Sequence, residues 1–242
     1  MLSKISNFSS NHSVDKFVLS QNFSNFVGNF AEEEIYKRKK EMRKEIKKKL
    51  QKIKSEEIET RSKKIVEKLF EHPKFLNSKS ISVFVSSKKL KEVETKEIIK
   101  KILKDGVKKC FVPRIESIEK SEMKMYRIYD EEDYQEMIAK GDKKELFEPN
   151  PFYKSKGREE AIDSKTLDLI LVPGLGFDYK NHRLGRGKGF YDNYIQKCNQ
   201  FYSLFSLPKP YLIGLAFAEQ LVKEIPVTKN DKNLDEVITD ED

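Results

Sequence analysis

Residues 167–174 read LDLILVPG, the most apolar segment of the chain with the character of a strand. Its centre, residues 169–172, contains no polar side chain. A strand with one solvated face alternates apolar and polar residues, whereas an unbroken apolar run is typical of a strand buried on both faces. We therefore expect residues 167–174 to form a strand in the middle of a sheet.

The segment 81–115 contains a strand, a helix and a second strand. Residues 81–85 (ISVFV) are rich in β-branched side chains, a helical pattern opens at Thr95 and ends at Asp105-Gly106, and residues 110–115 (CFVPRI) are again typical of a strand. Such a unit places its two strands parallel, with a right-handed crossover. The predicted fold class is therefore α/β.

The flanking sequence supplies the other elements of one domain over residues 31–242. Apolar residues at helical spacing occupy residues 32–70, where Ser55 followed by two glutamates marks a second helix start and Pro73 closes the pair. The remaining segments are a strand (123–129), a helix (130–139), a long polar connection (141–166), a strand (211–217) and short pieces (225–227 and 236–239). We predict a single three-layer domain with a mostly parallel central sheet flanked by helices and a long N-terminal helical segment.

Residues 1–30 differ in composition from the rest of the chain. They are rich in Ser, Asn and Phe, contain Asp15 as their only acid, and show no consistent period. An organelle presequence is usually acid-poor and Arg-rich, and this segment has no Arg. We treat it as an extension outside the fold, either a disordered tail or a targeting-like segment. We expect a cytoplasmic protein unless the extension directs it to mitochondria or another organelle.

The positive charge is concentrated in one stretch. The 48 Lys and Arg exceed the 40 Asp and Glu by eight, and residues 36–54 alone contain eleven Lys or Arg against Glu41 and Glu45. The rest of the chain is therefore near neutral. A basic helix of this kind either binds RNA or another polyanion or is a solvated helix face, so the net charge alone does not identify a nucleic-acid partner.

Several classes of protein are excluded by what the sequence lacks. The longest apolar stretches, such as residues 211–218, fall far short of the ~20 residues that cross a bilayer, so we expect no membrane partner. Two cysteines and three scattered histidines provide no zinc spacing, no Cys-x-x-Cys and no disulfide framework, which fits a reducing compartment. No G-x-S-x-G motif or Cys-His pair marks a nucleophile.

A glycine-rich loop follows the central strand. Residues 183–191 read RLGRGKGFY, in which Gly185, Gly187 and Gly189 alternate with cations before a helical pattern begins. Free backbone N–H groups beside the positive end of a helix dipole suit a phosphate. The loop is neither a Walker A loop nor the dinucleotide fingerprint. Its cations and aromatic residues favour anion binding over a tight turn alone.

Two acidic residues are candidates for a metal beside this loop. Asp192 stands just inside the following helix, and Asp231 lies in the late segment KNDKNLDE. Mg²⁺ is usually held by one or two carboxylates together with substrate phosphates and water, so two acids are enough. Asp192 also suits a helix start without any metal, and Asp231 also suits an ordinary turn.

The stretch FDYKNHRLGRGKGFYDNYI (177–195) closely resembles the signature of the 5-formyltetrahydrofolate cyclo-ligase family, the methenyltetrahydrofolate synthetases. Other blocks resemble that family in the same order: KKEMRKEIKKKL (39–50), ISVFVSSKKLKEVETKEII (81–99), KCFVPRI (109–115), MKMYRI (123–128) and LAFAEQLVKEIPVTKNDKNLDEVIT (215–239). The resemblance covers residues 37–239 and leaves residues 1–30 outside.

This resemblance implies an ATP- and Mg²⁺-dependent reaction that converts 5-formyltetrahydrofolate into 5,10-methenyltetrahydrofolate and releases ADP and phosphate. In the family, ATP phosphorylates the N5-formyl oxygen, N10 attacks the activated carbon, and phosphate leaves. Such a reaction requires positioning and charge neutralisation rather than a protein nucleophile. The implied partner is this small folate; we expect a monomer and no nucleic acid.

The residues that match the family's motifs form the implied site. ATP is implied to contact Lys39, Lys40, Glu41, Met42, Arg43, Arg183, Leu184, Gly185, Arg186, Gly187, Lys188, Gly189, Phe190 and Tyr191. The folate is implied to contact Val85, Glu92, Arg186, Gly187, Lys188, Gly189 and Phe190, and Mg²⁺ to contact Asp192 and Asp231. Arg186 is the implied catalytic residue, close to the reacting phosphoryl and formyl groups.

Four positions depart from the family pattern: Asn181 stands for Gly, Phe190 for Tyr, Asn193 often for Arg, and Leu146 for an aromatic residue. Asn also adopts left-handed backbone conformations, and Phe keeps a stacking face. These changes bear on substrate affinity rather than on reaction type. Two alternatives stay open: a catalytically inactive folate- or nucleotide-binding relative, and an RNA- or polyanion-binding protein that uses residues 36–54.

Overall fold

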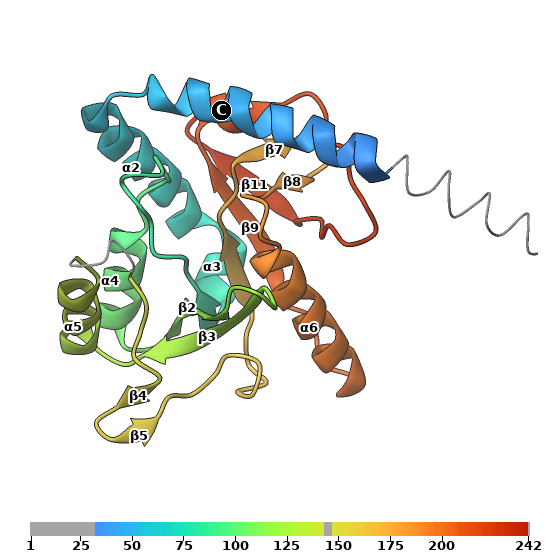
Figure 1. The fold of residues 1–242 in the computed structure, drawn as a ribbon. Helices are drawn as coiled ribbons and strands as arrows, with labels where there is room; N and C mark the ends of the chain where they lie inside the picture. Colours follow the sequence, from blue (N-terminus) through green and yellow to red (C-terminus); the bar gives the residue numbers. More distant parts are fainter. Residues whose placement is uncertain (1–31, 143–146, 242) are drawn as a thin grey trace, which may run out of the picture.

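A six-stranded sheet forms the centre of the computed structural model, which describes residues 32–142 and 147–241 (Figure 1). The strands lie in the order β11-β9-β6-β1-β2-β3, with these bounds: β1 (Ser80–Ser82), β2 (Lys109–Ser117), β3 (Glu122–Ile128), β6 (Leu169–Val172), β9 (Tyr211–Ala216) and β11 (Glu236–Thr239). Neighbouring strands are parallel except β3, which is antiparallel to β2. The predicted extension 1–30 and Leu146 lie outside the described residues.

The central position predicted for the apolar strand is confirmed. β6 lies between β1 and β9, and each of its four residues has no exposed surface. Leu169 and Leu171 belong to the core on one face of the sheet, and Ile170 and Val172 to the core on the other. The two-residue period of a strand thus supplies apolar side chains to both faces.

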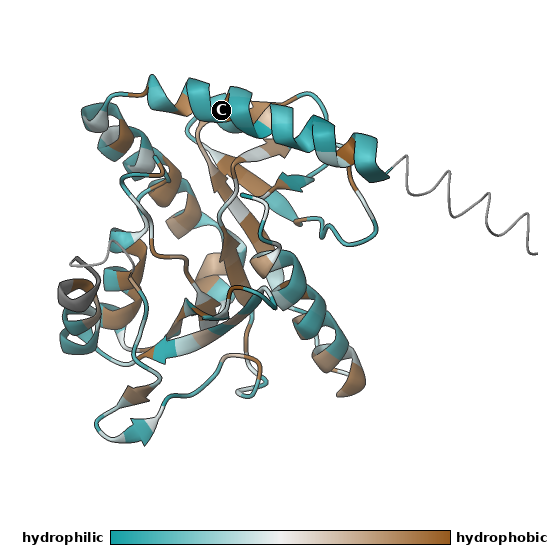
Figure 2. Ribbon diagram, in the orientation of Figure 1, coloured by the Kyte–Doolittle hydropathy of each residue, from teal (hydrophilic) through white to brown (hydrophobic). Residues whose placement is uncertain are grey.

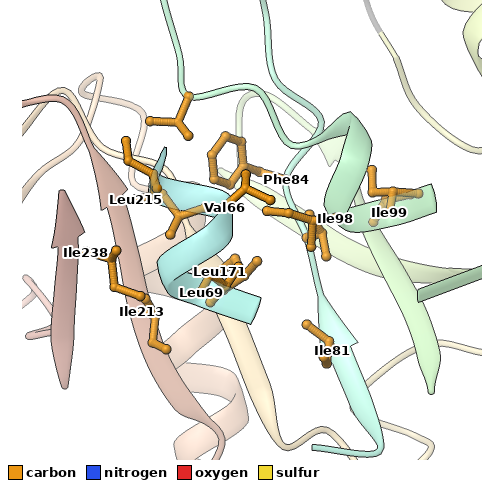
Figure 3. Close-up of a cluster of buried hydrophobic side chains, with 14 of the residues drawn as sticks. Val66, Leu69, Ile81, Phe84, Ile98, Ile99, Leu171, Ile213, Leu215 and Ile238 are labelled. Carbon is orange, nitrogen blue, oxygen red and sulfur yellow. The ribbon is translucent and has the colours of Figure 1, made fainter. Parts of the chain in front are cut away.

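Helices cover both faces of the sheet, so the predicted three-layer α/β architecture is confirmed. One face carries α2 (Ser55–Glu71), α3 (Pro73–Asn77), α4 (Lys96–Asp105) and α5 (Glu131–Asp142). Figure 3 shows side chains of α2 and α4 packed on those of β1, β6, β9 and β11. The other face carries α6 (Phe190–Leu204), through Tyr194, Ile195, Cys198 and Tyr202.

The boundaries of α4 follow from its sequence. Thr95 precedes the helix, and Gly106 ends it with a φ of +64°, a left-handed conformation that glycine adopts without steric cost. Ile98, Ile99 and Ile102 recur at helical spacing and are fully buried against the sheet. The predicted strand, helix, strand unit is therefore β1-α4-β2, with β1 and β2 parallel.

Two predicted elements are shorter or different. The ladder of β1 ends at Ser82 rather than residue 85, although the N–H of Val83 still donates to the carbonyl of Phe111 at 2.8 Å. Residues 225–227 form no strand, because the N–H of Ile225 donates to the side chain of Asp178 instead of to a neighbouring strand. The polar connection 141–166 contains the short hairpin β4 (Phe152–Tyr153) and β5 (Lys156–Gly157).

The N-terminal helix (residues 32–51) crosses one end of the molecule near β7 (Gly176–Asp178) and β8 (Arg183–Leu184) (Figure 1). In this small sheet β7 lies between β8 and β10 (Leu221–Val222). Ile46 and Leu50 are buried, whereas most of the helix surface is hydrophilic (Figure 2). Within the described ranges, no helix has the length and apolar character needed to cross a membrane.

Candidate functional site

The order of strands in the sheet reverses between β1 and β6. From β1 the chain proceeds outward to β2 and β3, whereas from β6 it proceeds in the opposite direction to β9 and β11. In open α/β sheets the crevice at such a reversal, outside the carboxyl ends of the strands, is the usual ligand site. A cavity of about 620 Å³ lies there, lined by residues that directly follow the two strands: Phe84 and Val85 after β1, and Pro173 and Gly174 after β6.

The cavity gathers most of the predicted site residues. Its lining includes Lys39, Arg43, Val85, Glu92, all nine residues of the loop 183–191, Asp192 and Asp231. Lys40, Glu41 and Met42 do not line it: Lys40 and Glu41 are exposed to solvent, and Met42 packs against the core. Since residues four apart share a helix face, Lys39 and Arg43 point to the cavity while the residues between them point elsewhere.

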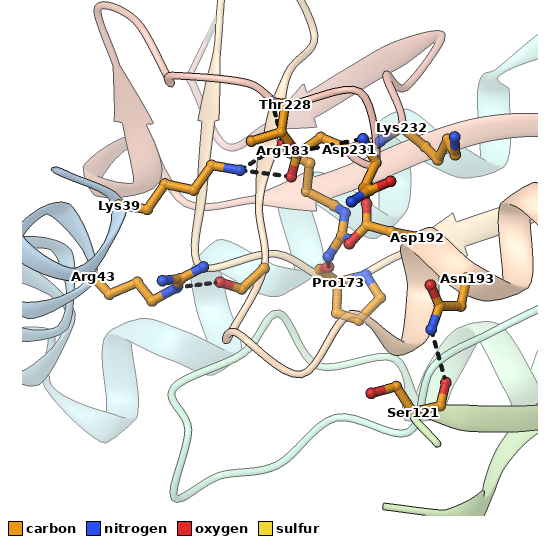
Figure 4. Close-up of polar contacts among 12 residues, drawn as sticks. Lys39, Arg43, Ser121, Pro173, Arg183, Asp192, Asn193, Thr228, Asp231 and Lys232 are labelled. Atoms are coloured by element: carbon orange, nitrogen blue, oxygen red, sulfur yellow. Dashed lines mark hydrogen bonds and ion pairs between the residues drawn. The ribbon is translucent and has the colours of Figure 1, made fainter. Parts of the chain in front are cut away.

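Lys39 pairs with Asp231 in the cavity wall (Figure 4). Its Nζ donates to the two carboxylate oxygens at 2.7 and 2.5 Å, and only 6% of Lys39 is exposed. The backbone N–H and the hydroxyl of Thr228 donate to the same carboxylate at 2.6 and 2.9 Å. Burial by itself raises the pKa of Asp231, but Lys39 and Thr228 together bring that pKa below its ordinary value.

Arg183 pairs with Asp192 beside the first ion pair. Its Nη2 donates to Asp192 Oδ2 at 2.8 Å, and its Nη1 donates to the carbonyl of Pro173 at 3.2 Å. The other Asp192 oxygen accepts the N–H of Lys232 at 3.2 Å, which ties α6 to the segment that carries Asp231. This arrangement brings the two predicted metal ligands to adjacent parts of one wall.

Arg186 pairs with Glu92 across the cavity. Its Nη2 and Nε donate to Glu92 Oε1 at 2.9 and 3.2 Å, and the other oxygen of Glu92 accepts the N–H of Ser87 at 3.0 Å. The side chain of Glu92 is 11% exposed and that of Arg186 is 30% exposed. The implied catalytic cation is thus the more accessible member of a pair that joins the glycine-rich loop to the loop after β1.

Arg43 holds the backbone of the glycine-rich loop. Its Nε donates to the carbonyl of Gly185 at 2.8 Å. Gly187 has a φ of +104°, and a Cβ there would lie 3.6 Å from the guanidinium carbon of Arg43, so this position combines a left-handed backbone with close approach of a cation. Burial lowers the pKa of Arg43, an effect that Tyr36 and Asp231 oppose. The glycines therefore let the loop pass directly under the N-terminal helix.

The acidic residues fit a divalent cation of the magnesium type. Asp192 and Asp231 both face the cavity, and carboxylates are the usual protein ligands of Mg²⁺ when phosphates and water complete its shell. Within residues 32–142 and 147–241 no group of three or more His, Cys, Asp or Glu could hold a metal by itself. The wall therefore suits a metal that arrives with a phosphate ligand rather than one held by protein alone.

The cavity also has apolar lining residues, most of which were not predicted as part of the site. These residues, the apolar wall, are Phe84, Leu90, Pro113, Ile115, Met123, Phe147 and Phe190, of which only Phe190 was a candidate. Pro113, Ile115 and Met123 lie on β2 and β3, whose alternating pattern indicates strands but not a cavity. One sequence signal could have indicated this part of the site. Residues 83–85 and 173–174 directly follow the two central strands, where ligands usually bind in an open α/β sheet.

Tyr191 has a buried hydroxyl that makes no hydrogen bond with any described residue. Burial, followed by the nearby negative charge of Glu92, raises its pKa, so the hydroxyl stays protonated and is an available donor. The ring also lies 5.7 Å from the guanidinium carbon of Arg183. Tyr191 therefore places an available hydroxyl donor in the cavity wall beside Arg183.

Two departures from the family pattern have clear structural outcomes. Asn181 has a φ of +62°, so the predicted left-handed conformation is confirmed. Its side-chain amide donates to the carbonyl of Asp235 at 3.0 Å. Asn193 lines the cavity and donates to the carbonyl of Ser121 at 3.3 Å, where it links α6 to the turn before β3 (Figure 4).

Comparison with known sequences identifies close relatives. The sequence model of the 5-formyltetrahydrofolate cyclo-ligase family matches residues 35–240. The chain is similar to the 5-formyltetrahydrofolate cyclo-ligase of Mus musculus, with 39% identity over 200 residues that span 83% of this chain and 92% of the relative. It is also similar to the mitochondrial 5-formyltetrahydrofolate cyclo-ligase of Arabidopsis thaliana, with 30% identity over 85% of this chain and 75% of the relative.

Solved structures show the same fold. The NMR structure of the Aquifex aeolicus 5,10-methenyltetrahydrofolate synthetase matches with a TM-score of 0.61 and 25% identity, over 84% of this chain and 90% of that one. A 5,10-methenyltetrahydrofolate synthetase from Mycoplasma pneumoniae matches with a TM-score of 0.59 and 25% identity, over 84% and 99% of the two chains. The α/β class and the resemblance seen in the sequence are both confirmed.

Proposed function

The chain belongs to the 5-formyltetrahydrofolate cyclo-ligase family, and on this premise we propose that it converts 5-formyltetrahydrofolate into 5,10-methenyltetrahydrofolate with ATP and Mg²⁺. The products are ADP and phosphate. The observation that carries the proposal is a single cavity that combines cations paired with carboxylates and an apolar wall. Two substrates of different chemistry, a polyanion and a flat heterocycle, require these two kinds of surface.

The chemistry proceeds in two steps. The formyl oxygen on N5 takes the γ-phosphoryl group of ATP, which makes a poor leaving group into a good one. N10 then attacks the formyl carbon and loses its proton, the carbon–oxygen bond breaks, and the phosphate leaves and takes up that proton as the methenyl bridge forms. Neither step requires a protein nucleophile, so catalysis rests on positioning and on neutralising the charge of the transferred group.

We assign the neutralising role to Arg186. Its side chain is more exposed than that of Arg183, the other paired arginine of the loop, and it lines the cavity from a glycine-rich segment. Release from Glu92 frees its Nε and Nη2 to donate to phosphoryl oxygens in the bidentate geometry that arginine favours. The loop 183–191 surrounds the phosphates in this assignment, and the neighbouring Gly187 admits their close approach.

Lys39 and Arg43 bind the ground-state phosphates in this assignment. Phosphate oxygens replace Asp231 as the partner of Lys39, and the released carboxylate becomes available to the metal. Asp192 and Asp231 would hold Mg²⁺, which supplies charge neutralisation at the phosphates when bound. The helix residues between these two cations, Lys40, Glu41 and Met42, do not line the cavity, so we assign them no contact with ATP.

The apolar wall and Glu92 receive the folate. A carboxylate accepts two N–H bonds from the 2-amino-4-oxo edge of a pterin, and Glu92 has both oxygens turned toward the cavity loops, where they accept from Arg186 and Ser87. Val85 and Phe190 line the same cavity as Glu92, and we assign them to contacts with the ring system. We further propose a monomer whose domain spans residues 31–242, with no nucleic-acid partner, in the cytoplasm.

The decisive test mixes the purified protein with Mg-ATP and 5-formyltetrahydrofolate and follows absorbance of the methenyl product. We expect product that depends on all three components, with one ADP released per product. Folate that binds without forming product would favour a catalytically inactive relative. Omission of Mg²⁺, with EDTA added, should abolish product formation.

The solvent face of the N-terminal helix supports a second candidate, polyanion binding. Nine of the eleven basic residues in 36–54 are exposed, whereas Lys39 and Arg43 turn to the cavity. If RNA binds through this face, the logarithm of its binding constant should fall linearly with the logarithm of the salt concentration. The reason is that binding releases the cations that had condensed on the RNA phosphates. Filter binding of a mixed-sequence RNA at two salt concentrations distinguishes this activity from folate turnover.

A further inference from the structure

Tyr36 is an exposed aromatic residue at the rim of the cavity. Its relative exposure is 64%, and it stands on the N-terminal helix three residues before Lys39 and seven before Arg43. Positions separated by three, four or seven residues lie along one helix face. Tyr36 therefore belongs to the same stripe as the two cations that we assign to phosphates.

The ring of Tyr36 is available to a ligand. It makes no stacking or cation–π contact with another described residue, and no hydrogen bond from its hydroxyl to a described residue is present. Its phenolic group is close enough to Arg43 to act on the pKa of that guanidinium. An aromatic side chain in this position leaves a large apolar face in water beside a charged site.

We propose that Tyr36 forms the stacking surface for the base of the nucleotide, an inference that rests on the proposed ATP site. Seven residues of helix rise about 10.5 Å, so Tyr36 and Arg43 are separated by the length of an extended nucleotide rather than of one phosphate. With phosphates at Lys39 and Arg43, the base extends along the helix toward the rim. The enclosed apolar wall beside Glu92 then remains for the folate.

This arrangement has a consequence for nucleotide selectivity. A π-face stacks on every base, so recognition by stacking discriminates weakly between adenine and guanine. Removal of such a ring typically weakens binding by about tenfold per base. We therefore expect GTP to bind within about tenfold of ATP, and both to lose affinity together when the ring is removed.

The experiment measures binding by calorimetry with the full chain and Mg²⁺, using AMP-PNP, GMP-PNP and inorganic tripolyphosphate as probes. Tyr36→Ala should weaken both nucleotides about tenfold and leave tripolyphosphate unchanged, because only the nucleotides carry a base. Tyr36→Phe keeps the ring and should bind like the parent. Tyr179→Ala is the matched control, since Tyr179 is 81% exposed and does not line the cavity.

Four results would overturn the inference. Unchanged nucleotide affinity in Tyr36→Ala removes the stacking surface. Equal weakening of tripolyphosphate and nucleotides in that variant assigns the effect to the phosphate end instead. If the parent protein binds tripolyphosphate but neither nucleotide, the inference fails and the cationic phosphate site remains. If the parent protein binds none of the probes, the proposed ATP site fails as well. An unfolding temperature equal to that of the parent protein confirms that each variant is folded.

Discussion

The N-terminal helix and the glycine-rich loop both bring cations to the cavity, but they hold them differently. The helix presents Lys39 and Arg43 from a regular backbone, and the same helix face continues to Ile46 and Leu50, which are buried in the core. The loop presents Arg186 from a segment that contains two glycines with positive φ. The side chain of Lys39 is 8% exposed, whereas that of Arg186 is 30% exposed, so the cation of the loop is the more accessible to a ligand. From this difference we propose that the helix binds ATP and the loop catalyses.

The ion pairs of the two segments support the same division. The pair of Lys39 with Asp231 is more deeply buried than that of Arg186 with Glu92, with side-chain exposures of 8% and 20% against 30% and 11%. Exchange of a more exposed arginine between a carboxylate and a phosphoryl group requires less reorganisation of the wall. Substitutions in the loop should therefore alter the rate, and substitutions in the helix should alter affinity.

The largest effect is expected for Arg186→Ala. An arginine that neutralises the transferred phosphoryl group contributes on the order of 10³-fold or more to turnover, so kcat should fall at least that far. Steady-state formation of the methenyl product measures it. The variant should remain folded, since Arg186 is partly exposed and Glu92 keeps its bond from Ser87.

Lys180→Ala is the control for Arg186→Ala. Lys180 forms an exposed surface pair with Glu224 outside the cavity, so its removal tests the loss of a nearby positive charge alone. If Arg186→Ala retained turnover within a few-fold of the parent, the loop would share the binding role of the helix and the contrast between the two segments would disappear.

A smaller effect is expected for Asp192→Asn at the join of loop and α6. A neutral amide keeps an oxygen ligand but loses the charge that offsets dehydration of Mg²⁺, so half-maximal activity should require a higher Mg²⁺ concentration. A Mg²⁺ titration at saturating ATP measures the shift. Saturating Mg²⁺ should restore most of the rate. An unshifted titration would leave Asp192 as the partner of Arg183 and nothing more.

For Lys39→Ala we expect a higher Michaelis constant for ATP with kcat nearly unchanged. Lys39 would bind phosphate equally in the ground state and the transition state, and loss of such uniform binding appears in KM. Arg38→Ala provides a matched control, because Arg38 is the adjacent exposed cation on the same helix. A large fall in kcat for Lys39→Ala would place the helix in the chemical step and contradict the division of roles.

The sequence predicted the polar half of this site better than the apolar half. The loop 183–191 is continuous and carries its own chemical signature, so its residues could be identified without a fold. Phe84, Ile115 and Met123 belong to ordinary strands and the residues after them, and only the order of strands in the sheet brings them to one wall. The pairing of Lys39 with Asp231, 192 residues apart, has no local signal at all.

The spacing of single residues shows the same limit within one motif. The block 39–43 matches the family as a unit, yet the helix turns Lys40, Glu41 and Met42 away from the cavity. A motif written along the sequence does not distinguish a residue that contacts a ligand from one that shapes the helix. The α-helix, with 3.6 residues per turn, makes that distinction, because residues three or four apart face the same side.

The smallest effect, none within error, is expected when residues 1–30 are deleted. Their sequence lacks the apolar periodicity needed to pack on a domain, and the family match begins at residue 35. The helix begins its buried stripe only at Lys39 and Ile46, so it should keep its cations in place without the preceding segment. Michaelis constants for ATP and 5-formyltetrahydrofolate, kcat and the unfolding temperature should all match those of the full chain. If only the KM for ATP rose, the extension would contribute to the nucleotide side of the cavity, because it precedes the helix that we assign to nucleotide binding. A lower unfolding temperature would instead make the extension part of the fold.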